Sequence, residues 1–137
     1  MENEYKKSYR GFVLFFICYL SVMIGGAIAS AYFLSEHATR IVINILCVGM
    51  ALLTYIIYKC DKIYWYNSIE FEDAEKAGKE RRDAYAKAYL KLFCIFAACM
   101  LAFSVIMALL SVSPWVDFTV GAVGICTVAI CTVKIKL

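Results

Sequence analysis

Polar side chains inside long apolar runs are the first candidates for chemistry in this chain. Tyr19, Asn44, Thr54 and Tyr55 all stand in such runs. Asn44 is the costliest of them to bury, because its amide needs several hydrogen-bond partners. We favour a hydrogen bond between helices for it, worth about 1 kcal/mol. The alternative is that the four residues line a polar pathway for a solute.

Ionisable side chains are absent from the centres of the same runs. Proton relays and acid or base catalysis within a membrane depend on such groups, and an ionisable residue there is a functional hypothesis by default. Asp117 begins the last run, where we expect headgroups and water to reach it and where the positive end of a helix suits a carboxylate. The sequence therefore predicts neither an enzyme nor a proton-coupled transporter.

The seven cysteines do not have the spacing of a metal site. Most lie inside the apolar runs, where a free cysteine behaves as a small hydrophobic residue. The pairs Cys94/Cys99 and Cys126/Cys131 are separated by five positions, which places their members about 140° apart around a helix. The one histidine, His37, lies outside the runs. We therefore expect no metal and no other cofactor.

The elements that carry these residues are four apolar stretches, each long enough to be a membrane-spanning helix. Apolar residues make up 64% of the 137-residue chain and charged residues 18%, against roughly half and a quarter in soluble domains. A helix of about 20 residues crosses the hydrocarbon core of a bilayer. We predict an all-α integral membrane four-helix bundle, a single domain over residues 1–137. The predicted spans cover residues 11–34, 41–58, 90–112 and 116–133.

Basic residues lie almost entirely on one side of the four predicted spans. Of the 14 Lys and Arg residues, Arg40 alone lies in a connection on the opposite side. The positive-inside rule makes the basic side cytoplasmic. We predict a multi-pass protein of the cell membrane, in contact with lipid, with both termini and the loop of residues 59–89 in the cytoplasm. The net charge of +3 is spread along that side and predicts no nucleic-acid partner.

The N-terminal run also resembles a signal peptide. Basic residues precede it, and Ala29, Ser30 and Ala31 have the small-residue pattern of a cleavage site. The run is longer than the apolar part of a usual signal peptide and is long enough to span. We expect it to stay uncleaved as the first span. If it were cleaved, three spans would remain in the same orientation.

Small residues gather in the first and last predicted spans. They form pairs spaced three or four apart, which let helix backbones approach closely. Packing within the bundle and a homodimer seam both explain them, and the sequence does not separate the two. The predicted packing residues are Gly25, Gly26, Ala29, Ser30, Gly121 and Gly124.

The loop of residues 59–89 is predicted to hold a cytoplasmic helical extension that runs into the third span. Ser68 is a candidate N-cap, and Gly78 either ends the helix or weakens it. The favoured interpretation is a solvated, salt-bridged helix. Steps of three or four give one modestly apolar face, formed by Phe71, Ala74, Gly78, Arg81, Tyr85, Ala88 and Leu92.

Two functional alternatives exist for this extension. One is a docking surface for a cytoplasmic partner, which Phe71, Arg81, Arg82 and Tyr85 would form. The other is a contact of Arg81 and Arg82 with anionic lipid, which the neighbouring acidic residues weaken.

We predict a small membrane protein that acts as an interaction or accessory subunit and forms homo-oligomers. Its partner would be a cytoplasmic or membrane protein. The first alternative is a transporter or channel for a neutral or apolar solute. The second is a lipid-modifying enzyme, whose acids and bases would come from the loop, namely Glu70, Glu72, Asp73, Arg81 and Arg82.

Overall fold

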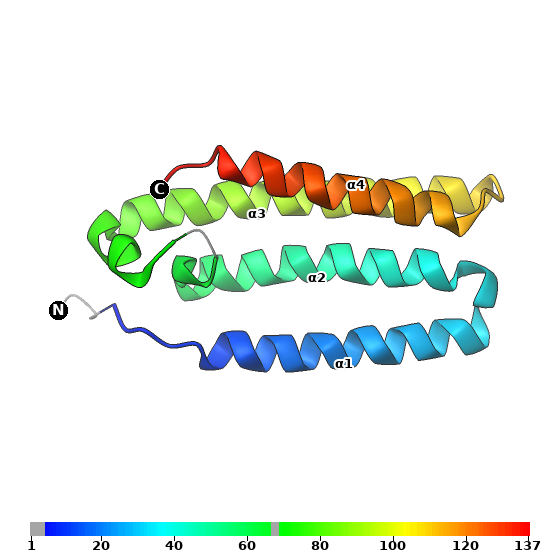
Figure 1. Cartoon of the computed structure of the whole chain (residues 1–137), viewed down its shortest axis with the longest axis horizontal. Coiled ribbons are helices and arrows are strands. Elements are labelled where there is room, and N and C mark those ends of the chain that lie inside the picture. Colours follow the sequence, from blue (N-terminus) through cyan, green and yellow to red (C-terminus); the bar gives the residue numbers. More distant parts are fainter. Residues whose placement is uncertain (1–4, 67–68) are drawn as a thin grey trace.

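The computed structural model describes residues 5–66 and 69–137, and these residues form helices and short connections without a strand. The predicted Ser68 cap lies outside the described residues. Figure 1 shows four long helices side by side, with both chain ends and the α2–α3 connection at the left. The elements are α1 (Arg10–Phe33), η1 (Ser35–His37), α2 (Ala38–Cys60), η2 (Ile63–Trp65), α3 (Phe71–Leu109) and α4 (Pro114–Val133).

All four long helices have the length and apolar character of membrane spans, as the sequence predicted. The shortest, α4, has 20 residues, which is about 30 Å at 1.5 Å per residue. Pro114 stands in its first turn, where the missing backbone N–H costs nothing. The helices α1 and α2 begin and end close to the predicted boundaries. The third, α3, begins at Phe71, about five turns before residue 90, where its span is predicted to begin.

Gly78 interrupts α3. Its backbone has φ 76° and ψ 162°, a conformation that glycine adopts without steric cost. The helical segment before it, residues 71–77, is therefore set apart from the segment after it, residues 79–109. The prediction of one continuous face from Phe71 to Leu92 is wrong for this reason, because the break changes the direction of the chain. Gly78 ends the first helical segment instead of merely weakening a longer one.

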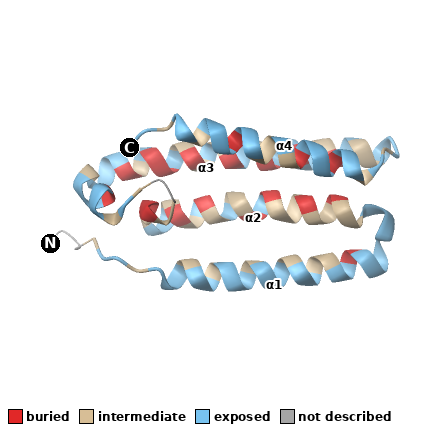
Figure 2. Ribbon diagram, viewed as in Figure 1, coloured by how far each residue is buried: buried red, intermediate tan, exposed pale blue. Residues whose placement is uncertain are grey.

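The second helix is central to the packing. It contacts α1 on one side and both α3 and α4 on the other, and α3 and α4 also contact each other. The first helix packs mainly along α2, so the arrangement is a three-helix core with α1 added, not four equivalent helices around one axis. Figure 2 shows the buried residues gathered on α2, α3 and α4, whereas α1 is mostly exposed. Ser30 is the only α1 residue that is fully buried.

Glycines set how closely the helices approach. A Cβ on Gly121 would lie 2.6 Å from Cγ1 of Ile43, and one on Gly124 would meet the ring of Phe96. The ring of Tyr19 covers Gly49 in the same way, although sequence reasoning did not select Gly49. In a bilayer such close packing supplies much of the association energy between helices.

The small residues of α1 divide between two faces. A Cβ on Gly26 would lie 2.6 Å from Cδ1 of Ile45, and Ser30 is buried on the same side. Gly25 has no heavy atom within 4 Å of its Cβ position, and Ala29 is exposed. Gly26 and Ser30 therefore pack inside the protein, whereas Gly25 and Ala29 face outward, where a homodimer seam would have to lie.

We expect Gly26→Leu to lower the melting temperature in detergent, while Gly25→Leu leaves it nearly unchanged. Forcing a large side chain against Ile45 costs about 1–3 kcal/mol. Both changes gain the same helix propensity, so the comparison removes that effect. Equal melting temperatures for the two variants would show that Gly26 is not at a packed seam. Loss of self-association in Gly25→Leu alone would support the predicted homo-oligomer.

Candidate functional site

The most elaborate set of contacts lies where the two chain ends meet the α2–α3 connection. We call this region the head and define it as residues 5–9, 61–66 and 69–89. The chain turns there because Asp61 ends α2 in the left-handed conformation, with φ 52° and ψ 49°. Ile63 and Tyr64 of η2 then insert into a core with Ile57 and Ala74. This core fixes the connection against both α2 and α3.

A partly buried ion pair joins the start of the connection to α3. Arg82 donates from Nε to Oδ1 of Asp61 at 2.8 Å and from Nη2 to Oδ2 at 2.7 Å. Its Nη1 donates to the carbonyl oxygen of Ala74 at 3.1 Å, across the break at Gly78. The hydrogen bonds to Asp61 raise the pKa of the Arg82 guanidinium above its ordinary value. The paired guanidinium sets the angle between the two segments of α3.

The N-terminal tail is bound across η2. The Tyr64 hydroxyl accepts from the backbone N–H of Ser8 at 2.8 Å and donates to its carbonyl at 3.0 Å. The indole N–H of Trp65 donates to the same carbonyl at 3.1 Å. Lys62 Nζ donates to the carbonyl oxygen of Lys6 at 2.6 Å. These bonds fix the tail before α1 begins.

Aromatic rings hold the tail from its other side. Tyr5 stacks on Phe71 with the ring centroids 5.3 Å apart, and it meets Tyr64 edge to face at 5.8 Å. The Arg82 guanidinium lies 4.0 Å from the Tyr5 ring centroid. Burial raises the pKa of the Tyr5 phenol. The tail, η2 and the first segment of α3 thus share one aromatic cluster.

A second aromatic cluster ties the head to the end of α4. Tyr66 packs on Tyr89 at 4.2 Å and Tyr85 on Tyr89 at 4.8 Å between ring centroids. The Tyr85 hydroxyl donates to that of Tyr89 at 2.9 Å, and Tyr89 donates to the carbonyl of Thr132 at 3.4 Å. Burial raises the pKa of Tyr66. The C-terminal end of the chain is therefore part of the same assembly.

The described residues of the head form two grooves. The first, which we call the tail groove, has a volume of about 410 Å³. The second, which we call the C-terminal groove, has a volume of about 390 Å³. The tail groove is lined by Lys7, Tyr9, Phe12, Tyr64, Trp65, Tyr66, Ile69, Glu70, Phe71 and Glu72. The C-terminal groove is lined by Ile69, Asp73, Lys76, Ala77, Arg81 and Leu137.

The structure does not bring the predicted docking residues together on one exposed face. Of Phe71, Arg81, Arg82 and Tyr85, only Arg81 is exposed. Arg82 and Tyr85 are buried, and Phe71 is half-buried against Tyr5. The predicted lipid contact of Arg82 is likewise unsupported, because its guanidinium is bound to Asp61. The loop carboxylates proposed for an enzyme are divided, with Glu70 and Glu72 on the tail groove and Asp73 on the C-terminal groove.

A second polar site lies at the opposite end of the helices. Arg40 of α2 donates from Nε to Oδ2 of Asp117 at 2.9 Å, and Nη2 donates to the carbonyl oxygen of Val112 at 2.9 Å. Asp117 is 0% exposed and Arg40 is 6% exposed. The expectation that water and headgroups reach Asp117 is therefore wrong. One feature of the sequence could have indicated this ion pair. In a topology of four spans, Arg40 and Asp117 lie at the start of two helices that begin at the same end of the protein.

Asn44 lies one turn along α2 from Arg40. Its Nδ2 donates to Oγ of Ser104 in α3 at 2.7 Å and to the carbonyl oxygen of Arg40 at 2.8 Å. The first of these is an interhelical hydrogen bond of the kind that the sequence favoured. Together with Arg40 and Asp117 it links α2, α3 and α4 through polar contacts at one end of the core.

The four residues of the predicted polar pathway do not share one cavity. Tyr19 donates to the carbonyl oxygen of Leu46 at 3.2 Å and, with Asn44, lines an apolar groove of about 400 Å³ between α1 and α2. Thr54 is buried and donates to the carbonyl oxygen of Ala51 at 2.8 Å within its own helix. Tyr55 points outward and is 45% exposed.

Among the described residues, no group of three or more His, Cys, Asp or Glu side chains has the arrangement of a metal site. No family model, curated protein or solved structure matches the chain. The functional argument therefore depends on the contacts of the head and of the polar site at the opposite end.

Proposed function

We propose that this chain is an integral membrane protein of the cell membrane that acts as an interaction or accessory subunit, with the head and both termini in the cytoplasm. The four apolar helices support insertion. The common position of the chain ends supports an even number of crossings. The charge asymmetry of the sequence supports the orientation, because basic loops stay on the cytoplasmic side.

The observation that carries the proposal is the ordered head. Its ion pair, tail contacts and aromatic clusters hold a surface in a defined shape. Apolar helices do not need such a surface in order to cross a membrane. On that surface the C-terminal groove combines apolar and charged groups, because Asp73, Lys76 and Arg81 line it together with Ile69 and Leu137. A rigid surface of this mixed chemistry suits a protein partner, since preorganisation lowers the entropic cost of binding.

The alternatives have less support. A transport pathway would need Tyr19, Asn44, Thr54 and Tyr55 on a common route. Tyr19 and Asn44 share a groove, but Thr54 is buried against its own helix and Tyr55 is exposed, so the four do not line one route. A lipid-modifying site would need loop carboxylates that converge, and these are divided between two grooves.

We expect a photo-crosslinking amino acid at Lys76 to give a discrete adduct with a protein partner in native membranes. The same amino acid at Ile130, an exposed apolar position of α4, should give no such adduct. Arg81→Glu should abolish the Lys76 adduct, because it reverses a charge on the C-terminal groove. Glu80→Lys changes a neighbouring exposed charge outside the groove and should leave it. Identical adducts from Lys76 and Ile130 would contradict an interaction surface on the head.

A further inference from the structure

We propose that the tail groove binds the phosphoethanolamine headgroup of a phospholipid from the inner leaflet. The inference rests on the membrane placement of the proposed function and adds a ligand of defined chemistry to the head. It uses the tail groove, whereas the protein partner is assigned to the C-terminal groove.

The tail groove holds opposite charges that do not neutralise each other. Lys7 lines it together with Glu70 and Glu72. Within residues 5–66 and 69–137, none of these three forms an ion pair within 4.0 Å. A zwitterion, with a phosphate and an ammonium at separate positions, is complementary to this arrangement. A purely anionic headgroup would leave the two carboxylates unpaired.

Aromatic rings form the rest of the wall and favour a cation. Tyr9 and Tyr64 meet edge to face with the ring centroids 5.4 Å apart, and Phe71 and Trp65 also line the groove. Aromatic faces attract an ammonium group. Phe71 already has a cation nearby, because Lys7 Nζ lies 5.5 Å from its ring centroid.

The carboxylates select among zwitterionic headgroups. A primary ammonium donates three hydrogen bonds, and an ionised carboxylate only accepts them. A trimethylated ammonium has no N–H and gains only the contact with the rings. Glu70 and Glu72 are both exposed, so an ammonium can reach them from the surface. Hydrogen bonds from the ammonium to these carboxylates therefore favour ethanolamine over choline. The Lys7 ammonium is a compact positive charge and can pair with the phosphate of the headgroup.

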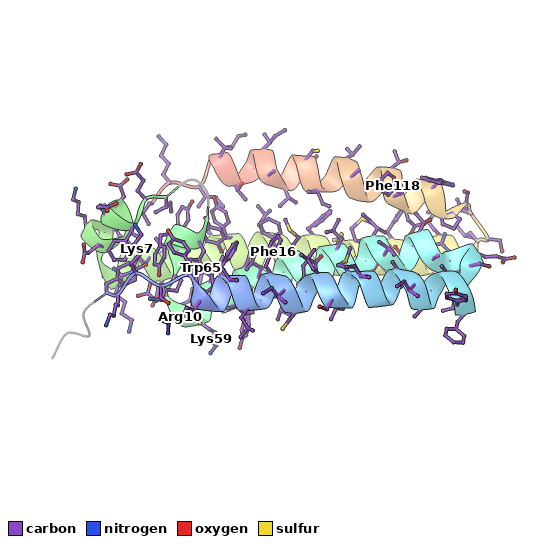
Figure 3. The ribbon with its side chains drawn as sticks, turned by 60° about the horizontal axis from the view of Figure 1, so that its bottom comes forward. Lys7, Arg10, Phe16, Lys59, Trp65 and Phe118 are labelled. Atoms are coloured by element: carbon purple, nitrogen blue, oxygen red, sulfur yellow. The ribbon has the colours of Figure 1, made fainter. Side chains whose placement is uncertain are left out.

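The groove lies where a lipid headgroup would be. Trp65 packs on Gly11 at the start of α1, 3.0 Å from the Cβ position, and Phe12 lines the groove one residue later. Further along α1, Val13 and Phe16 are exposed. Figure 3 shows Lys7, Arg10 and Trp65 gathered near the start of α1, with Phe16 beyond them along the helices. Acyl chains can follow this apolar surface away from the head.

The contacts of the N-terminal tail order the tail groove before a lipid binds. Tyr64 and Trp65 both bind the backbone of Ser8, which fixes the position of its neighbour Lys7. The lipid therefore meets a groove whose walls are already in place.

The test uses the fluorescence of Trp65 in the full chain. Trp115→Phe removes the other tryptophan, which is exposed at the far end. The protein is placed in vesicles of phosphatidylcholine and phosphatidylglycerol. Each vesicle sample contains the same small fraction of one lipid with brominated chains, which is phosphatidylethanolamine, phosphatidylcholine or phosphatidylglycerol. Bromine quenches tryptophan at contact. From the quenching of Trp65 we expect phosphatidylethanolamine to bind the tail groove roughly two to five times more strongly than phosphatidylcholine. This is the range of affinity that exposed ion pairs provide.

Paired variants separate the headgroup contact from general lipid contact. Glu70→Gln with Glu72→Gln should abolish the preference, while Glu80→Gln, an exposed acid outside the groove, should keep it. Equal quenching by brominated phosphatidylethanolamine and brominated phosphatidylcholine in the parent protein would overturn the inference and leave the proposed function intact. Stronger quenching by brominated phosphatidylglycerol would also overturn it. Absence of quenching by every brominated lipid would overturn the membrane placement as well.

Discussion

Asp117→Asn is expected to destabilise the protein by about 3–5 kcal/mol, because it leaves the Arg40 guanidinium buried without a compensating charge. The carboxylate is completely buried and lies 2.9 Å from Arg40 Nη2. An asparagine at this position can still accept one hydrogen bond, but it does not neutralise the cation. Chemical denaturation in detergent micelles, followed by circular dichroism, measures the loss.

The compensating double variant tests whether the charge itself is responsible. Replacing Arg40 by Met and Asp117 by Leu removes both charges, and such replacements of buried pairs by apolar residues are often neutral or stabilising. We expect the double variant to recover most of the stability that Asp117→Asn loses. Glu36→Gln removes an exposed acid at the same end and should have no measurable effect. If Asp117→Asn were as stable as Glu36→Gln, the ion pair would not hold α2 and α4 together.

A cysteine at position 35 is expected to react with a membrane-impermeant maleimide in intact cells, and a cysteine at position 80 is expected not to react. Ser35 and Glu80 are both exposed, so access to the protein surface does not limit either reaction. In the proposed orientation the bilayer separates the two positions, because a basic loop is expected to stay in the cytoplasm. The seven native cysteines are replaced first, of which Cys47 alone is buried.

Permeabilised cells provide the control for this experiment. Both positions should then react to the same extent, since both side chains are exposed. Reaction at position 80 with protection at position 35 in intact cells would reverse the proposed orientation. Reaction at both positions in intact cells would place them on the same side and contradict the four crossings.

The positions of the long helices could be predicted from the sequence because their signal is local. An uninterrupted apolar run of about 20 residues has few alternatives to a helix once it is removed from water. The hydrogen-bonding role of Asn44 was also local, since an amide within an apolar run must find a partner. By contrast, the choice of Gly26 over Gly25 as the packed glycine depends on which face of α1 meets α2. That face is poorly defined in a helix that is apolar all round.

The contacts of the head and the ion pair between Arg40 and Asp117 could not be predicted, because they depend on residues that are distant in the sequence. Arg82 appeared to belong to a solvent-facing helix surface, yet Asp61 binds it from 21 positions away. The break at Gly78 is responsible for the difference. The prediction assumed that the helix continues through Gly78, and such a helix would have placed residues 71–77 differently relative to Arg82. Arg40 and Asp117 each looked interfacial when considered alone. Only the packing of α2 against α4 shows that they share one buried site.

The separation of Arg40 from Asp117 along the chain has a consequence for biosynthesis. The two residues are 77 positions apart, and a ribosome adding 5–20 residues per second needs roughly 4 to 15 seconds to cover that distance. If the chain inserts as proposed, the α1–α2 hairpin carries an unpaired Arg40 guanidinium throughout this interval, at the end that the proposed orientation places outside. The hairpin avoids burying this unpaired charge if Arg40 stays among the lipid headgroups. Once α4 packs against α2, Arg40 pairs with Asp117 and becomes buried in the protein. The last helix to be synthesised, α4, thus supplies the carboxylate that pairs with the arginine of the first helical hairpin.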